Sequence, residues 1–299
     1  METILKTNNL TKKYGHKLAV NKVNVTINKG DIYGFIGKNG AGKTTFMKMI
    51  LGLTYKTDGD IELFESKNLK ENGYKIGSLI EAPGLFKNAT AYENMYRFSL
   101  IYGKGDDINE LLDLVGLKNV GKKKVKDFSL GMKQRLGIAI ALLGDPEFLV
   151  LDEPINGLDP AGIKEVRDVI LKLNKKKGIT FLISSHLLDE LSKVVTKYGI
   201  IDNGVLVEEV SSQELIDRCR NKLVIVTKDL NKTKKVLKEM VNEDDIIIKD
   251  NEIELLSHVE DGEKINKLLV SHDIYASKIC PQLDSLEDYF IDKIGGIHE

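Results

Sequence analysis

The sequence predicts an α/β fold built on a mixed, largely parallel sheet, followed by a small α+β domain. Two apolar segments, EFLVLDEP at 147–154 and GITFLISSH at 178–186, are typical of strands buried on both faces of a parallel sheet. Such strands alternate with segments whose apolar residues recur at helical spacing. After about residue 215 the pattern changes. The 299 residues therefore suit one large domain, 1–215, and a small one, 216–299.

The first domain is expected to alternate strands, glycine turns and helices. Strands are expected at 5–10, 17–27, 31–36, 74–81, 147–154 and 178–186. Helices are expected after a glycine-rich turn that ends at residue 42, within the glycine-punctuated region 92–125, and at 131–144, 161–176 and 187–195. Because the carboxyl ends of parallel strands meet at one edge of a sheet, residues that follow these strands are candidates for a shared site.

The second domain has the element order βαββαβ. Strands are expected at 222–226, 245–249 and 252–256, and helices at 231–241, 262–271 and, last of all, 285–294. This order suggests a ferredoxin-like arrangement. No cluster of chemically active side chains stands out in this domain. Support of a dimer is the leading interpretation, and regulation or ligand binding stay open.

Composition limits the partners that the chain can have. Lys and Arg total 44 and Asp and Glu 45, so a net charge of −1 gives no reason to expect nucleic acid. The two cysteines, Cys219 and Cys280, lie far apart, which disfavours a disulfide framework or zinc cluster and suits a reducing compartment. The longest apolar stretch, 136–143, is under half of the ~20 residues that span a membrane, and no signal peptide is visible. A membrane role would need spans from another subunit.

A glycine-rich segment between a predicted strand and a predicted helix matches the phosphate-loop pattern. The segment GKNGAGKT consists of Gly37, Lys38, Asn39, Gly40, Ala41, Gly42, Lys43 and Thr44, and Thr45 follows it. Glycines let backbone N–H groups converge on phosphate oxygens, and the N-terminus of a helix favours anions. Lys43 can reach the β- and γ-phosphates, and Thr44 can offer its hydroxyl to Mg²⁺. The loop predicts nucleotide binding without saying which reaction follows.

Three further candidates follow buried strands. Asp152 and Glu153 end the segment EFLVLDEP, where Asp152 suits a role in holding Mg²⁺ and Glu153 could take a proton from an attacking water. His186 follows the next buried strand. A lone histidine is more often structural, and an acidic turn taken alone is as often simply solvated as functional. Because both follow parallel strands, as the phosphate loop does, we expect them to share its edge of the sheet.

In their order along the chain these motifs resemble the ATP-binding cassette ATPases, over roughly residues 5–215. Walker A (GKNGAGKT) and Walker B (FLVLDEP) are both present. The resemblance implies that Tyr14 stacks on adenine, that Ser129 and Gly131 of FSLGMKQ form the signature, and that Asp159 belongs to the loop after Walker B. It also implies that Ser185–His186 contains the switch histidine and that a helical subdomain occupies about 85–145.

Two positions depart from the usual family pattern. Leu130 replaces the first glycine of the Leu-Ser-Gly-Gly-Gln signature, although Ser129 and Gly131 remain. Glu81 stands where the family usually has a glutamine that touches Mg²⁺ or water and senses the transmembrane partner, so Glu81 is a third candidate metal ligand after Thr44 and Asp152. Both departures are similar to the bacitracin-export and lantibiotic-immunity branch of the family.

The resemblance implies an ATPase with ATP and Mg²⁺ as its nucleotide and cofactor, working as a homodimer with ATP at the interface. It implies a separate transmembrane permease, a location at the cytoplasmic face of the membrane, export of antimicrobial peptides or similar amphiphiles, and no nucleic acid. The segment 81–95 is where the permease would dock. Two alternatives stay open: a soluble cassette ATPase that remodels ribosomes or DNA, and a metabolic phosphotransferase. The second lacks a visible acceptor site and leaves FSLGMKQ and His186 unexplained.

Overall fold

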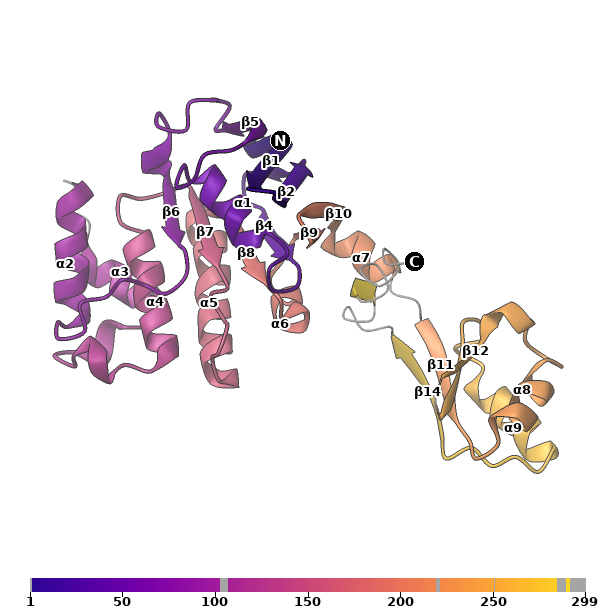
Figure 1. Ribbon diagram of the computed structural model, residues 1–299. Helices are drawn as coiled ribbons and strands as arrows, with labels where there is room; N and C mark the ends of the chain where they lie inside the picture. Colours follow the sequence, from indigo (N-terminus) through magenta and orange to yellow (C-terminus); the bar gives the residue numbers. More distant parts are fainter. Residues whose placement is uncertain (1, 103–106, 219–220, 250, 284–288, 291–299) are drawn as a thin grey trace. The chain divides into compact units, whose positions relative to one another are not determined.

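The computed structural model describes residues 2–102, 107–218, 221–249, 251–283 and 289–290. The chain forms two compact units, Met1–Gln213 and Glu214–Glu299, and each is described by itself (Figure 1). Helix α7 (Ser212–Arg218) spans the boundary between them. The predicted fold class is confirmed: a mixed, largely parallel α/β sheet with helices, followed by a small α+β unit.

A six-stranded sheet in the first unit carries the parallel strands. Its spatial order is β10-β9-β4-β8-β7-β6. The bounds are β4 Ile32–Ile36, β6 Ile76–Leu79, β7 Phe148–Asp152, β8 Thr180–Ser185, β9 Lys197–Asp202 and β10 Val205–Ser211. Strands β6, β7, β8, β4 and β9 run parallel, and β10 pairs with β9 antiparallel. All five residues of β4 and of β7 are buried, as expected of strands covered on both faces.

An antiparallel sheet lies over α1 (Lys43–Ile50). It comprises β1 (Thr3–Tyr14), β2 (Lys17–Val23), β3 (Thr26–Asn28) and β5 (Asp58–Leu63). The prediction of one strand over 17–27 is wrong, because the structure has two strands there, β2 and β3. Between them, Asn24 Oδ1 accepts from the Asn9 N–H at 2.7 Å, and the Thr7 N–H donates to the Val25 carbonyl. Strand β1 therefore changes its pairing partner at this point. Sequence patterning also missed β5, β9 and β10.

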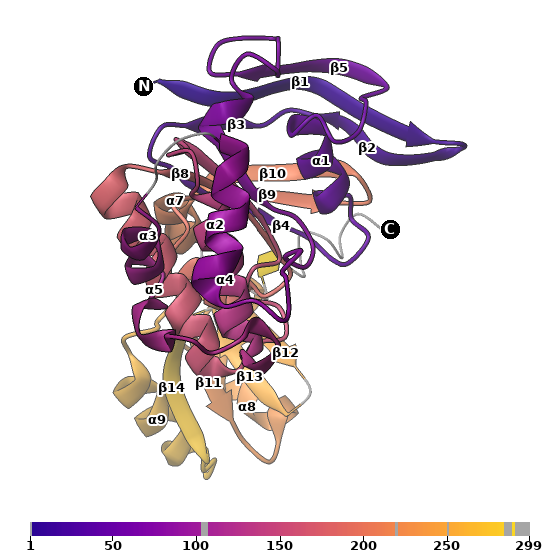
Figure 2. The same ribbon diagram turned by 90° about the vertical axis from the view of Figure 1, so that its left-hand side faces the viewer.

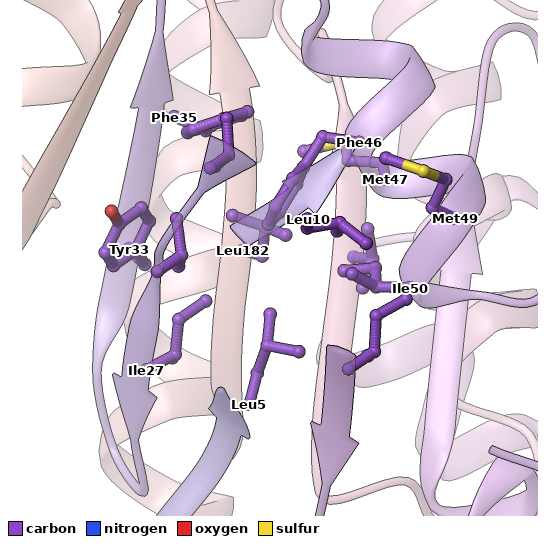
Figure 3. Close-up of a cluster of buried hydrophobic side chains, with 14 of the residues drawn as sticks. Leu5, Leu10, Ile27, Tyr33, Phe35, Phe46, Met47, Met49, Ile50 and Leu182 are labelled. Carbon is purple, nitrogen blue, oxygen red and sulfur yellow. The ribbon is translucent and has the colours of Figure 1, made fainter. Parts of the chain in front are cut away.

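Apolar side chains from both sheets and α1 form a single cluster (Figure 3). Phe35 and Phe46, whose ring centroids are 4.8 Å apart, pack at its upper end together with Met47. Other members are Leu5, Leu10, Ile27, Tyr33, Met49, Ile50 and Leu182. The cluster fixes α1 against β4, and therefore fixes the turn that joins them.

Helices α2 (Ala91–Tyr102), α3 (Ile108–Leu114) and α4 (Leu130–Ala141) pack together, and α5 (Pro160–Lys177) packs on α4 (Figure 2). Short 3₁₀ turns lie at Gly73–Lys75, Lys118–Val120 and Val125–Asp127, and α6 spans Leu188–Ser192. The helical region predicted over 92–125 is broken. Asp107 caps a new helix by accepting from two N–H groups, and Gly116 ends it at φ +69°. Arg135 Nη1 then donates to the Val115 and Gly116 carbonyls at 3.0 Å.

The second unit is a four-stranded antiparallel sheet with two packed helices. Its elements are β11 (Asn221–Val226), α8 (Leu230–Leu237), a 3₁₀ turn (Glu243–Asp245), β12 (Ile246–Lys249), β13 (Glu252–Leu255), α9 (Gly262–Ser271) and β14 (Lys278–Leu283). The spatial order β12-β13-β11-β14 is ferredoxin-like. Leu223, Ile225 and Leu269 belong to its core. Apart from 289–290, the helix predicted over 285–294 lies outside the described residues.

Within the described residues, no helix combines the length and the hydrophobicity that crossing a bilayer requires. Cys280 is a free, half-buried cysteine. Cys219 lies outside the described part of the chain.

Candidate functional site

The carboxyl ends of β4, β8, β7 and β6 lie at one edge of the large sheet, because these strands run parallel. Gly37 follows β4, Asp152 ends β7 and His186 follows β8, so all three reach this edge. Glu81 follows β6 by two residues. Ligands of open α/β sheets bind at such an edge.

The loop from Gly37 to Gly42 is a tight turn that requires glycine. Gly42 has φ +108°, and a Cβ there would lie 2.3 Å from the Ala19 carbonyl oxygen. A Cβ on Gly37 would lie 2.3 Å from the Ile201 carbonyl oxygen. Helix α1 begins at Lys43, so its unpaired N-terminal N–H groups open into the loop. The loop is therefore fixed by its neighbours in a conformation that suits a phosphate group.

A cavity of about 370 Å³ lies at this loop. Its lining consists of Tyr14, Lys17, Ala19, Asn39, Gly40, Gly42, Lys43, Thr44, Thr45 and Glu153. Tyr14, at the end of β1, is 51% exposed, and the Lys12 ammonium lies 4.7 Å from its ring centroid. An exposed aromatic ring at the mouth of a phosphate-binding loop can stack on a nucleobase, since every base has a π-face.

Lys43 is buried inside the site and fully paired. Its ammonium donates to the Gly37 carbonyl at 2.6 Å and to the Lys38 carbonyl at 3.3 Å. It also lies 3.2 Å from Glu153 Oε1, and its side chain is only 6% exposed. Burial of an ammonium group is tolerated when oxygen ligands replace its water, as these three do.

Thr44 and Asp152 form a hydroxyl–carboxylate pair with the chemistry of a magnesium site. Thr44 Oγ1 donates its only proton to Asp152 Oδ2 at 2.8 Å, so the hydroxyl lone pairs are free to bind a cation. Among the described residues, no group of three or more His, Cys, Asp and Glu side chains could hold a metal alone. Mg²⁺ usually binds one or two carboxylates together with substrate phosphates, so these two residues fit it.

Glu153 lies between Lys43 and His186. Its Oε2 is 2.8 Å from His186 Nδ1, and its Oε1 faces the Lys43 ammonium. Within the described chain, Oε1 is buried and makes no hydrogen bond, because Lys43 approaches as an ion pair outside hydrogen-bond geometry. Glu153 also has φ +49°, a sparsely populated conformation for a non-glycine residue. A partly buried carboxylate with one oxygen outside any hydrogen bond suits a group that accepts a proton from water.

Glu81 makes a different contact from the metal contact that the resemblance implies. Its carboxylate accepts from Lys48 at 2.7 Å, and its side chain is 68% exposed. This hydrogen bond lowers the pKa of Glu81 below its usual range. Lys48 lies on α1, one turn after Thr44. The pair therefore lies beside the phosphate loop, and the predicted role of Glu81 as a metal ligand stays a prediction.

Ser129, Gly131 and Asp159 do not line the cavity around Lys43. Ser129 is exposed and caps α4 by accepting from the Met132 N–H at 3.2 Å. Asp159 caps α5 through the Gly162 N–H at 3.1 Å. A Cβ on Gly131 would lie 3.4 Å from Gly162 Cα, so the two helix N-termini approach closely there.

Sequence patterning missed Ser184. The residue is fully buried in β8, and its hydroxyl contacts both Asp152 and the Glu153 backbone. Its only signal in the sequence is a polar residue near the end of an apolar strand. Lys48, the partner of Glu81, was also missed, because lysine on a helix surface is common.

The comparisons with known proteins agree on one family. The ABC transporter family model matches residues 20–156. The bacitracin transport ATP-binding protein BcrA of Bacillus licheniformis is 47% identical over 302 residues, which cover 99% of both chains. This chain belongs to the ABC transporter family. The lantibiotic transport ATP-binding protein SrtF of Streptococcus pyogenes is 45% identical over 229 residues, covering 75% of this chain and 99% of SrtF.

Solved structures of ABC cassettes have the same fold. MJ1267, an ATP-binding cassette of an ABC transporter in its ADP conformation, has a TM-score of 0.65 and 25% identity, covering 73% of this chain and 96% of that structure. A nucleotide-free cassette of an ABC transporter has a TM-score of 0.63 and 27% identity, covering 72% of this chain and 94% of that structure.

These findings decide between the functions that the sequence left open. The chain is the ATP-binding subunit of an ABC transporter and an ATPase, as its motifs predicted. The predicted resemblance to the bacitracin and lantibiotic branch is confirmed. The alternative of a soluble cassette acting on ribosomes or DNA is not supported, because these relatives are transport proteins.

Proposed function

We propose that this ABC ATPase powers the export of amphiphilic antimicrobial compounds, bacitracin-like peptides first among them, through a separate membrane permease. The match to BcrA supports this substrate class, because it covers 99% of the chain and so includes both compact units. The linearmycin resistance ATP-binding protein LnrL of Bacillus subtilis, at 29% identity, also covers 98% of the chain. The compounds named for these relatives differ, so the proposal is for a class of compounds and not for one of them.

The Lys43–Glu153–His186 arrangement is the single observation that carries the ATPase mechanism. Lys43 holds the terminal phosphates of ATP by charge. Glu153, whose Oε1 makes no hydrogen bond among the described residues, takes the proton from the attacking water. His186 hydrogen-bonds the other oxygen at 2.8 Å and so fixes the direction in which the carboxylate points. Tyr14 binds the base of the nucleotide by stacking.

Thr44 and Asp152 would hold the Mg²⁺ that accompanies ATP. The ion neutralises developing phosphate charge in such sites. Thr44 can offer its oxygen lone pairs to the ion, because its hydroxyl proton is donated to Asp152. Glu81 could add its carboxylate as a third ligand if it left Lys48, and its 68% exposure gives it the freedom to do so. Such a move would link the site to the surface where a permease docks.

A homodimer closed by ATP is the working state in this proposal. Ser129 is exposed at the start of α4, a 12-residue helix whose N-terminus can meet a phosphate through the N–H groups that precede the capped N–H of Met132. Because neither Ser129 nor Gly131 lines the cavity at Lys43 of the same chain, they are available to the nucleotide of a second copy. Asp159 lies beside them at the start of α5.

An apolar groove in the first unit suits a permease segment. The groove has a volume of about 330 Å³ and is lined by Leu53, Ser78, Leu79, Ile80, Ala82, Pro83, Gly84, Phe98, Gly137 and Ile140. Exposed side chains on α2, Tyr92, Tyr96 and Leu100, recur every four residues and so follow one face of that helix. Exposed apolar surface of this kind marks binding sites. Docking there would hold the chain at the cytoplasmic face of the membrane.

The test is a resistance assay in the organism that carries this chain. Deletion of the gene should raise sensitivity to bacitracin or a related peptide, and wild type but not Lys43→Ala should restore growth. Tyr96→Lys should also fail and should leave the chain in the soluble fraction, whereas Tyr275→Lys, at an exposed tyrosine of the second unit, should behave as wild type. Unchanged sensitivity across a panel of amphiphilic antibiotics would refute the substrate class.

A further inference from the structure

Ser184 links the two consecutive acidic residues of the site through one hydroxyl group. Strands β7 and β8 pair in register, with Asp152 opposite Ser184. Ser184 Oγ donates to Asp152 Oδ1 at 2.5 Å and accepts from the Glu153 N–H at 2.9 Å. Ser184 is 0% exposed and Asp152 is 5% exposed, so water cannot easily replace either bond.

We propose that Ser184 is a positioning residue for the magnesium–nucleotide complex, an inference that rests on the proposed metal role of Thr44 and Asp152. The terminal torsion of an aspartate is broad, so its backbone alone does not fix which oxygen faces a ligand. Ser184 holds Oδ1, and this directs Oδ2 towards Thr44. Residues that hydrogen-bond a metal ligand in this way set its orientation and commonly change metal affinity when mutated.

The second bond of Ser184 acts on Glu153. Glu153 has φ +49°, and such a conformation persists only where its surroundings hold it. The Ser184 hydroxyl satisfies the Glu153 N–H and therefore stabilises the backbone turn that presents the carboxylate to His186. One hydroxyl thus orients both the residue that holds the metal and the residue that activates water.

Ser185 provides a matched control. It adjoins Ser184 in β8 and is also 0% exposed. Its hydroxyl accepts from the Leu187 N–H at 2.9 Å and donates to the Leu187 carbonyl at 3.4 Å. Neither bond involves Asp152 or Glu153. Removing the Ser185 hydroxyl therefore perturbs the same strand without touching the acidic pair.

The experiment compares full-length wild type, Ser184→Ala, Ser184→Thr and Ser185→Ala. Affinity for a fluorescent ATP analogue is measured in EDTA, and Mn²⁺ binding in the presence of ATP is measured by electron paramagnetic resonance. We expect Ser184→Ala to weaken Mn²⁺ binding about tenfold, equivalent to about 1.4 kcal/mol. Nucleotide affinity in EDTA should stay within about twofold of wild type, since the phosphate loop is untouched. Ser184→Thr, which keeps the hydroxyl, should restore Mn²⁺ affinity, and Ser185→Ala should match wild type.

Wild-type Mn²⁺ affinity in Ser184→Ala would overturn the inference, and so would an equal loss of nucleotide affinity in EDTA, which a general structural defect produces. If thermal unfolding shows that Ser184→Ala does not fold, Ser184→Cys, a variant of similar size and weaker donor strength, is judged by the same two results. If wild type bound no Mn²⁺ with ATP, the proposed metal site would fail together with this inference. Retained Mn²⁺ affinity in Ser184→Ala would refute this inference and leave the proposed metal site standing.

Discussion

Replacement of Glu153 by glutamine should stop hydrolysis while leaving the nucleotide site intact. The carboxylate lies 3.2 Å from Lys43 and 2.8 Å from His186, and its side chain is 20% exposed. Loss of a general base costs about 10²- to 10⁴-fold in kcat, which is about 3 to 5 kcal/mol of activation free energy. Glutamine keeps the size of the side chain but removes its attraction for Lys43, which at 3.2 Å is about 5 kcal/mol at an effective dielectric constant of about 20. ATP should therefore bind at least as tightly as in wild type.

The assay is size-exclusion chromatography with light scattering, alongside ATP turnover. With ATP and Mg²⁺, Glu153→Gln should elute at twice the 33.4 kDa mass of the chain, because the nucleotide that joins two copies in the proposed dimer is no longer cleaved. Glu147→Gln is the matched control: it precedes the same strand at its other end, and among the described residues its ion pairs are with Lys29 and Lys75, at 3.6 and 3.7 Å. Wild-type turnover in Glu153→Gln, or a monomer with bound ATP, would refute the assignment of Glu153 and the closed dimer.

Three further substitutions and one titration test separate parts of the structure. Lys43→Ala should abolish binding of a fluorescent ATP analogue, because it removes the buried ammonium of the loop. Glu81→Gln should keep that affinity but change transport by the whole complex; unchanged transport would contradict a coupling role. Phe46→Ala, in the cluster of Figure 3, should cost about 3 to 5 kcal/mol in urea unfolding. The hydrogen bond from Lys48 lowers the pKa of Glu81 below its ordinary value, so an NMR titration should find the midpoint of Glu81 below that of an unpaired glutamate.

Much of the fold could be predicted because local pattern and tertiary environment agree. Strands β7 and β8 are buried on both faces, and their central residues, 148–151 and 181–183, are correspondingly apolar. Strands β11, β12 and β13 and helices α8 and α9 of the second unit were visible from alternation and helical spacing, whereas no residues were assigned to β14. The phosphate loop was visible because its glycines are required: at Gly42 any other residue would collide with the Ala19 carbonyl.

Strand β5 shows why other elements could not be predicted. Its sequence, DGDIEL, begins with three residues that disfavour strands, and only its pairing with β1 over Leu5–Thr11 makes it a strand. The break near Asn24 likewise depends on Asn9, 15 residues away. Side-chain hydrogen bonds and partner strands that lie far apart in sequence override local propensity at both places.

The candidate site, too, could be predicted only in part from the sequence. Which residues reach the sheet edge follows from strand order, and this is visible in the sequence. Which atoms then meet depends on register. Asp152 lies opposite Ser184 and not opposite Ser185. A shift of one residue would turn the Ser184 hydroxyl to the other face of the sheet and leave Asp152 Oδ1 and the Glu153 N–H without this partner. The sequence alone does not distinguish Ser184 from Ser185, because both are serines in the same buried strand. Their different hydrogen bonds are set by the register of the folded sheet.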